Sequence, residues 1–158
     1  MTRADWRFAP ASSDDADAMR TLARAAYEKY VPRIGREPGP MFADYDAIAA
    51  SGRALLVWQG SHLVAFLVTE LEDDALLIDN VAVSPDQQGA GLGSRLLEIA
   101  EEQAMDAGKP TVRLYTNEAM TENIALYTRR GFVETHRATE HGFTRVFMTK
   151  HLGSPPAQ

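Results

Sequence analysis

A glycine-rich segment that follows a short apolar run contains the residues of this chain best placed to hold an anionic ligand. The run Val81-Ala82-Val83-Ser84-Pro85 ends in a proline, and Gly89, Gly91 and Gly93 then follow at alternate positions. Glycine lets the backbone approach a ligand closely because it has no Cβ atom. A helix that begins here would add unpaired N–H groups and the positive end of its dipole. The segment therefore predicts a site for a phosphate or pyrophosphate.

Two phosphorylated cofactors are compatible with such a loop, and the first is a dinucleotide. The run Gly89-Ala90-Gly91-Leu92-Gly93-Ser94 imitates G-x-G-x-x-G with serine at the last position, and Glu118 supplies a later acidic residue. That fingerprint normally opens its domain, whereas here more than half of the chain precedes it. The part that follows Glu118 is also too short for a second mononucleotide-binding half. A dinucleotide is therefore the weaker alternative.

The second cofactor is acyl-coenzyme A, and three ordered motifs favour it. The spacing Gln88-x-x-Gly91-x-Gly93 matches the pattern Q/R-x-x-G-x-G/A, and the chain in this respect resembles the GNAT superfamily of acyl-CoA-dependent N-acyltransferases. Residues 78–85 look like the fourth strand of that family. Residues 123–127, followed by Arg130-Gly131-Phe132, look like its later cofactor-contacting helix and turn. The order and spacing of the motifs fit from about Trp6 to Lys150.

The resemblance implies an α/β (α+β) fold of the GNAT type, with a central mixed, mostly antiparallel twisted sheet of about six or seven strands and helices on both faces. Residues 1–152 would form a single N-acetyltransferase domain, and 153–158 would be a flexible C-terminal tail. Hydrophobic periodicity and turn residues predict the elements themselves. We expect strands at 5–9, 53–58, 62–71, 75–83, 111–115, 132–137 and 142–150, and helices at 13–30 (capped by 13–15), 41–50, 91–107 and 121–130.

The resemblance also implies that acetyl-CoA is the acyl donor. Two central strands of the family splay apart, and backbone N–H groups of Val81, Ala82 and Val83 would then polarise the thioester carbonyl; alternatively, these residues only form a buried strand. Gln88 would shape the loop or donate to phosphate, and Ser94 would donate its hydroxyl unless it is an ordinary first-turn serine. The expected cofactor contacts are Val81, Ala82, Val83, Gln88, Gly89, Ala90, Gly91, Leu92, Gly93, Ser94, Asn117, Asn123, Ala125 and Tyr127.

Acetyl transfer to an amine needs a proton donor for the departing thiolate and an acceptor for the proton of the amine. Tyr127 lies four residues after Asn123 on one helix face, and the resemblance implies that its phenol is the donor. Gly131 also predicts a C-terminal helix cap in which Phe132 packs on Tyr127, and the two roles are compatible. Asp79 would accept the amine proton directly or through water, unless it is only an exposed carboxylate near the end of a strand.

The acceptor is expected to meet the segment between the first two helices, which in this fold covers the acceptor pocket. Tyr27, Tyr30, Arg33 and Arg36 are the candidate substrate contacts on this proline-rich stretch. Aromatic rings and guanidinium groups suit a small amine that also carries a carboxylate or a ring. Alternatively, the two arginines only neutralise helix-end carbonyls or surface acids.

Composition limits the partners of the chain. Its 158 residues carry a net charge of −6, which argues against binding to nucleic acid or to an anionic membrane surface. The sequence contains no cysteine, which fits a reducing cytoplasm, and its four histidines lack the spacing of a metal site, so no metal is expected. The longest apolar run, 63–68, is too short to cross a bilayer.

The favoured hypothesis is an N-acetyltransferase that passes an acetyl group from acetyl-CoA to a primary amine of a small molecule, by direct attack in a ternary complex. The alternatives are an acyltransferase for protein N-termini or lysines, and a regulatory module that binds acyl-CoA without catalysis. The presence of Tyr127 favours an enzyme, because a binding module need not retain it. A homodimer is left open.

Overall fold

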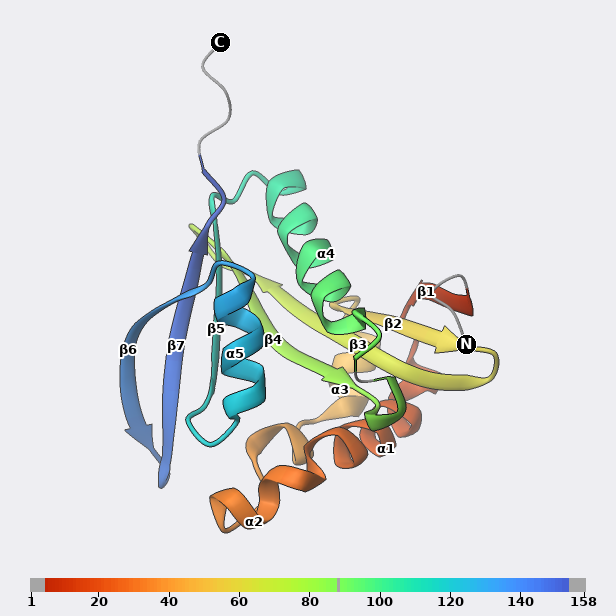
Figure 1. The fold of residues 1–158 in the computed structure, drawn as a ribbon. Coiled ribbons are helices and arrows are strands. Elements are labelled where there is room, and N and C mark those ends of the chain that lie inside the picture. Colours follow the sequence, from red (N-terminus) through yellow and green to blue (C-terminus); the bar gives the residue numbers. More distant parts are fainter. Residues whose placement is uncertain (1–4, 88, 154–158) are drawn as a thin grey trace. The chain divides into compact units, whose positions relative to one another are not determined.

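The computed structural model describes residues 5–87 and 89–153. Its strands form one sheet in the order β1-β2-β3-β4-β5-β7-β6 (Figure 1). They are β1 (Trp6–Pro10), β2 (Ala54–Gln59), β3 (His62–Leu71), β4 (Leu76–Val83), β5 (Thr111–Asn117), β6 (Val133–Glu140) and β7 (Phe143–His151). Pairing is antiparallel for β1 with β2, β2 with β3, β5 with β7 and β6 with β7, and parallel for β4 with β5. The predicted mixed, mostly antiparallel sheet is confirmed.

Within the described part of the chain, five α-helices and four 3₁₀ turns connect these strands. The helices are α1 (Ala16–Tyr27), α2 (Val31–Ile34), α3 (Tyr45–Ala50), α4 (Leu92–Asp106) and α5 (Thr121–Arg129), and the turns are η2 (Ser13–Asp15), η3 (Glu28–Tyr30), η4 (Gly39–Met41) and η5 (Pro85–Gln87). The hairpin through Gly60 and the end of α4 at Gly108, whose φ is +72°, agree with the sequence predictions. Gly108 ends the helix because it adopts the left-handed conformation without steric cost.

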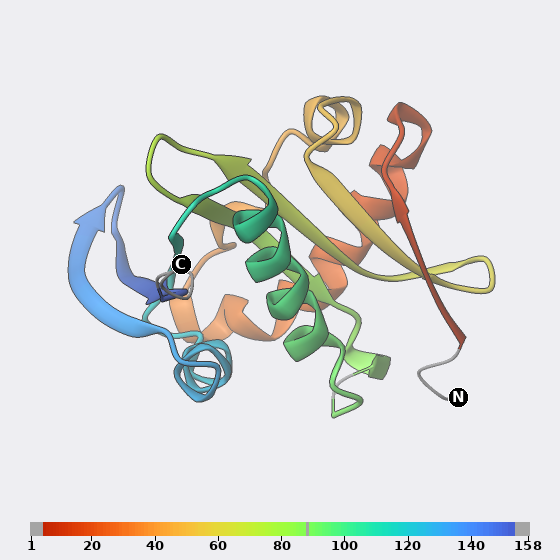
Figure 2. The ribbon, with the colours of Figure 1, turned by 90° about the horizontal axis from the view of Figure 1, so that it is seen from above.

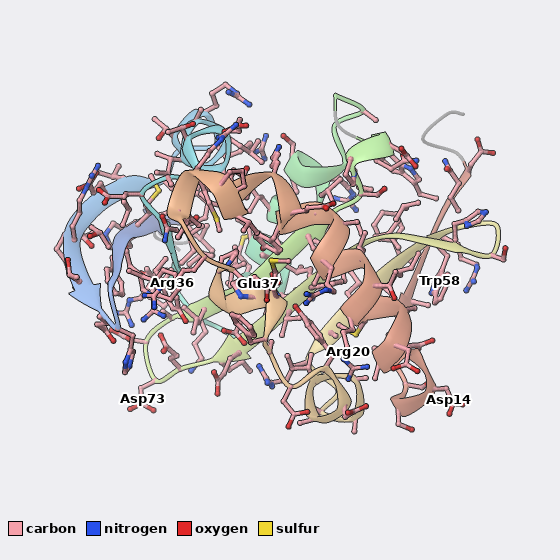
Figure 3. All side chains as sticks on the ribbon, turned by 90° about the horizontal axis from the view of Figure 1, so that it is seen from below. Asp14, Arg20, Arg36, Glu37, Trp58 and Asp73 are labelled. Carbon is pink, nitrogen blue, oxygen red and sulfur yellow. The ribbon has the colours of Figure 1, made fainter. Side chains whose placement is uncertain are left out.

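The chain divides into two compact units, each with its own core. The first unit comprises the described residues of 1–68 and 80–96. Its helix α1 contacts α3 and η4 and lies on one face of β2 and β3 (Figures 2 and 3). Arg20 of α1, labelled in Figure 3, joins the two helices through an ion pair with Asp46 of α3 and also pairs with Asp17 within α1.

The predicted cap at 13–15 is the 3₁₀ turn η2, which leads into α1. Asp15 is the N-cap residue of α1 and Ser12 is that of η2, and the Ser12 backbone N–H donates to the Asp15 carboxylate at 2.8 Å. The Ser12 hydroxyl also donates to this carboxylate at 3.2 Å. Ser12 and Asp15 have the three-residue spacing of a capping box, which satisfies orphan N–H groups reciprocally. This spacing explains why the cap lies at Ser12.

The segment after α1 is more helical than predicted. The sequence indicated a break at Pro32, yet η3 and α2 continue the chain in tight turns as far as Ile34. Proline is tolerated in the first turn of α2 because its missing N–H would have no helical partner there. Gly35, with a φ of +89°, then ends α2 and donates its N–H to the Val31 carbonyl at 2.8 Å. Of the residues expected to break the first helix, Gly35 rather than Pro32 ends the helical turns.

The second unit comprises the described residues of 69–79 and 97–158. Its strands β5, β7 and β6 form a curved set of ribbons, and α5 lies on one face of β5 and β7 (Figures 1 and 2). Alternate residues of β5 and β7 are buried, among them Val112, Leu114, Val146 and Met148. This alternation is the period-two pattern of strands that cover a core on one face.

Candidate functional site

The loop before α4 contains two glycines in a conformation that other residues rarely adopt. Gly89 has a φ of +85° and Gly91 a φ of +84°. The Ala90 N–H donates to the Gln87 carbonyl at 3.2 Å, and the Arg95 N–H donates to the Gly91 carbonyl at 3.0 Å. A Cβ atom at Gly89 would meet open space, so the backbone conformation, rather than crowding, requires glycine there.

The fifteen-residue helix α4 begins directly after this loop, at Leu92. The first N–H groups of a helix have no intrahelical acceptor, and the helix dipole makes this end positive. The predicted contacts Leu92, Gly93 and Ser94 all lie in that first turn, and Ser94 is half-buried. This backbone arrangement suits a pyrophosphate, which is part of coenzyme A. Gln88, the predicted loop residue, lies outside the described residues.

Strand β4 alternates buried and half-buried residues along its length. Asn80 and Ala82 are buried, whereas Asp79, Val81 and Val83 are half-buried. The register of β4 with β5 runs from Leu76 to Ile78, and β4 itself continues to Val83. Beyond the strand end, the Ser84 N–H donates to the Val64 carbonyl of β3 at 2.8 Å.

A buried group of hydrogen bonds joins β4 to the helices of the first unit. The Tyr27 hydroxyl lies 2.8 Å from both the Asn80 Oδ1 atom and the Val81 carbonyl oxygen. The Asn80 Nδ2 group donates to the Tyr45 hydroxyl at 3.0 Å, and that hydroxyl donates to the Pro40 carbonyl. Tyr27, predicted to be a substrate contact, thus directs its hydroxyl at the candidate strand. The sequence analysis missed Asn80 and Tyr45, because contacts over such sequence separations leave no local pattern.

Gln87 is a second polar residue that the sequence analysis did not select. Its side chain is 9% exposed; its Nε2 donates to the Gln59 Oε1 at 3.0 Å, and its Oε1 accepts from the Trp6 indole at 3.2 Å. These bonds tie the start of the glycine loop to β1 and β2. A signal for this role was available only in the neighbouring glycines, which marked the loop but not which glutamine supports it.

In the second unit, Tyr127 lies in the last turns of α5 and is buried. The Phe132 N–H donates to the Tyr127 carbonyl at 3.0 Å, and the Gly131 N–H donates to the Thr128 carbonyl at 3.1 Å. These two bonds, with Gly131 at a φ of +96°, define a Schellman motif. The Tyr127 and Phe132 rings pack edge to face at a centroid distance of 6.0 Å. The predicted cap and its aromatic contact are confirmed.

The other predicted residues of the second unit lie near the turn that leads into α5. The Asn117 Oδ1 atom accepts the Ala119 N–H at 2.9 Å and so closes this turn. Asn123 is half-buried and Ala125 is exposed on α5, whereas Asp79 belongs to β4.

The predicted acceptor residues differ in their exposure. Tyr27 and Tyr30 are buried, whereas Arg33 and Arg36 are exposed. The Arg33 guanidinium lies 5.2 Å from the centre of the Tyr30 ring, which is a cation–π distance. Arg36 follows α2 and is labelled in Figure 3, next to Glu37, whose carboxylate pairs with Arg24 at 2.9 Å. The two arginines therefore lie on the outer side of this segment, and the aromatic rings lie beneath it.

Within residues 5–87 and 89–153, no group of three or more His, Cys, Asp or Glu side chains could hold a metal ion. Over the same described part of the chain, no helix is both long and apolar enough to span a membrane.

Comparison with known proteins assigns the fold and the loop to a family. The model of the acetyltransferase (GNAT) family matches residues 16–132. Because that match covers well over half of the chain, the protein belongs to the GNAT family of acetyltransferases. The GNAT resemblance indicated by the three sequence motifs is confirmed.

Individual relatives are more distant. The chain is 33% identical over 84 residues to a mycothiol acetyltransferase of Catenulispora acidiphila, covering 49% of this chain and 27% of that protein. It is 36% identical over 76 residues to the [ribosomal protein bS18]-alanine N-acetyltransferase of Escherichia coli K12, covering 48% and 51%. The matches thus span about half or less of these relatives. A PaiA N-acetyltransferase from Thermoplasma acidophilum, solved in complex with coenzyme A, shares the fold with a TM-score of 0.72, 16% identity and coverage of 92% and 98%.

Proposed function

We propose that this protein transfers an acetyl group from acetyl-CoA to a primary amine of a small molecule, by direct attack of the amine in a ternary complex. The observation that carries the proposal is the pair of left-handed glycines, Gly89 and Gly91, at the start of the long helix α4. In a member of an acetyltransferase family, this arrangement suits the pyrophosphate of coenzyme A.

The chemistry is divided between backbone and side-chain groups. N–H groups of 81–83 would donate to the thioester carbonyl and stabilise the negative charge that develops on its oxygen. The Tyr127 hydroxyl would give its proton to the departing thiolate, and Asp79 would take the proton of the attacking amine, directly or through water. The edge-to-face contact of Tyr127 with Phe132 supports the first role, because it holds the phenol ring in one orientation.

The acceptor would be recognised by the segment from Tyr30 to Arg36. Two exposed guanidinium groups, Arg33 and Arg36, suit an amine that carries a carboxylate, which arginine binds in a bidentate manner. The Arg33 guanidinium lies over the buried Tyr30 ring, which would hold this guanidinium in place. Likeness to a mycothiol acetyltransferase supports a small-molecule acceptor.

A second candidate acceptor is the amino group of a protein N-terminus. The similarity to a relative named for the alanine of ribosomal protein bS18 favours it. The two acceptors are distinguished by a panel that contains small amines and short peptides with free N-termini. Turnover of the peptides alone would exclude the small-molecule proposal.

The cofactor half of the proposal is tested by thermal unfolding with coenzyme A and with NAD at equal concentrations. Coenzyme A should raise the unfolding temperature, because a ligand that binds only the native state shifts unfolding by mass action. Gly91→Glu should remove this shift by placing bulk and negative charge at the phosphate position. Gly60→Glu is the matched control, since Gly60 is also left-handed, with a φ of +62°, but lies in the β2–β3 hairpin. A shift with NAD and none with coenzyme A would overturn the assignment.

A further inference from the structure

Three polar side chains of the first unit are buried and joined to one another by hydrogen bonds. Tyr27 of α1, Asn80 of β4 and Tyr45 of α3 are 6%, 7% and 0% exposed. We call these residues the Tyr27–Asn80–Tyr45 relay. Both of its ends lie on backbone carbonyls, that of Val81 at one end and that of Pro40 at the other. Buried polar groups that lose a partner are costly, so the members of the relay hold one another in place.

The Pro40 carbonyl determines which groups of the relay donate and which accept at Tyr45. A carbonyl only accepts, so the Tyr45 hydroxyl gives its proton to Pro40 and must accept from Asn80 Nδ2. The Asn80 Oδ1 atom then faces Tyr27, whose hydroxyl shares its single proton between Asn80 and Val81. Turning the Asn80 amide over would place its Oδ1 atom against the Tyr45 oxygen, whose proton is given to Pro40, so the contact with Tyr45 determines the orientation of the amide.

The relay holds β4 on both sides of the Val81 N–H. The side chain of Asn80 is held at both of its amide atoms, and the carbonyl of Val81 is held by Tyr27. The peptide between Asn80 and Val81 is planar and joins these two anchored points. The setting of the Val81 N–H is therefore limited by bonds that come from outside the sheet. The same bonds fix the plane of the Val81–Ala82 peptide, and with it the direction of the Ala82 N–H.

At its other end the relay reaches the segment that would cover the acceptor. Pro40 lies in η4, between Arg36 and the α3 helix that supplies Tyr45. Asn80 and Pro40 therefore share one partner, the Tyr45 hydroxyl. A shift of the η4 turn would pull on Tyr45, and through it on the Asn80 amide and on β4.

We propose that Tyr27, Asn80 and Tyr45 are positioning residues that set the β4 peptides around Val81 for the thioester carbonyl and couple this setting to the η4 segment. The proposal rests on the proposed acetyl transfer. It differs from a role in stability alone, because the relay then acts on the acyl group of the donor rather than on the folded state. A hydroxyl that serves only stability would change the unfolding temperature and leave donor preference and kcat unaltered.

The test compares Tyr27→Phe and Tyr45→Phe with Thr111→Val. The control removes a buried hydroxyl, which contacts the His151 ring at 3.2 Å, from the second unit. Calorimetry with acetyl-CoA and with coenzyme A gives the ratio of the two dissociation constants and needs no acceptor. Tyr27→Phe should leave the coenzyme A affinity unchanged and lower the preference for acetyl-CoA by about threefold to tenfold, the worth of one hydrogen bond.

Kinetics with the best amine of the panel supply the second readout. Tyr27→Phe should lower kcat by about tenfold to a hundredfold, as expected for a misplaced reacting group, with the KM for acetyl-CoA little changed. Tyr45→Phe should show a smaller loss of the same kind together with a raised acceptor KM. The double variant should lose less than the product of the single effects, because both hydroxyls act through Asn80.

The two failures are distinguishable. If the parent protein binds acetyl-CoA but releases no thiol with any amine, the proposed transfer fails, and the affinity ratio of Tyr27→Phe still decides the relay. If the parent turns over, and both tyrosine variants keep its donor preference and kcat while losing thermal stability like Thr111→Val, the relay is structural only and the inference is overturned.

Discussion

The Phe132 N–H donates to the Tyr127 carbonyl at 3.0 Å while the rings of the same two residues meet edge to face at 60°. One Schellman motif thus ends α5 and packs the ring of the candidate proton donor against Phe132. The hydroxyl lies at the far end of the packed ring, so removing it leaves the packing of the ring intact. Stability and proton donation can therefore be separated by substitution.

Tyr127→Phe should fold like the parent and bind coenzyme A with the same affinity. Its kcat should fall by about tenfold to a thousandfold, within and just below the usual range for the loss of a general acid. Tyr115→Phe on β5 is the matched control, since Tyr115 is partly exposed and packs on Phe147. An unchanged kcat in steady-state assays would leave Tyr127 with the packing role, and the proton would then come from water.

Gly131→Ala should destabilise the protein by about 1–2 kcal/mol, the cost of the left-handed conformation for a residue with a Cβ atom. Gly131 has a φ of +96°, and an added Cβ would lie 3.3 Å from the Lys150 Cε atom, which belongs to a flexible side chain. Gly39→Ala is the control, since no atom lies within 4 Å of its added Cβ. Urea denaturation of both variants measures the difference; equal midpoints would contradict the conformational argument.

Arg33→Ala or Arg36→Ala should raise the KM of a carboxylate-bearing acceptor by about ten- to a hundredfold, the worth of a charge-assisted hydrogen bond. The KM for acetyl-CoA should stay nearly constant. Lysine at the same position should restore little, because it lacks the planar fork of arginine. Arg20→Ala, which removes one ion pair within α1 and one between α1 and α3, serves as the control. If both alanine variants use the acceptor as well as the parent does, the acceptor is bound elsewhere.

Two surface ion pairs each lower the pKa of one carboxyl group, and replacing the arginine of one pair should affect only the carboxyl group of that pair. The hydrogen bond from Arg113 lowers the pKa of Asp74 below 3.8, and the hydrogen bond from Arg137 lowers the pKa of Glu134 below 4.5. A carboxylate with a depressed pKa stabilises the fold above its unfolded-state pKa, and this contribution is lost as the pH falls through the folded-state value. Both contributions therefore disappear only in acid, below about pH 4 to 5.

Arg113→Met should raise the pKa of Asp74 toward its ordinary value and leave the pKa of Glu134 unaltered, and Arg137→Met should do the reverse. Titration of the side-chain carboxyl resonances by NMR measures both groups in each variant. Each arginine variant is thus the control for the other. If Arg113→Met left the pKa of Asp74 where it is in the parent, the ion pair would not exist in solution.

The sequence predicted most elements because their signals are local. The helical periodicity of α4, the hairpin at Gly60 and the cap at Gly131 each depend on residues that are close together in the sequence. The helical continuation past Pro32 was missed because proline was treated as a break, although it suits a first helical turn.

The candidate site was only partly predictable. The glycine loop and Tyr127 carry motifs, whereas the relay depends on Tyr27 meeting Asn80 across 53 positions of the chain. In the sequence Asn80 is one polar residue within an apolar strand, and this pattern does not distinguish a buried amide from an exposed one. The role of Gln87 beside the loop was likewise hidden, because its partners Gln59 and Trp6 come from other strands.

The most direct test of the proposed function is release of free thiol from acetyl-CoA when amines are added to the purified protein, with the acetylated amine identified by mass spectrometry. We expect thiol release that depends on one class of small primary amine, appears in equal amount with its acetylated product, and is lost in Gly91→Glu but retained in Gly60→Glu. Tight binding of coenzyme A without thiol release for any small amine or peptide would contradict the account and identify the protein as a binding module.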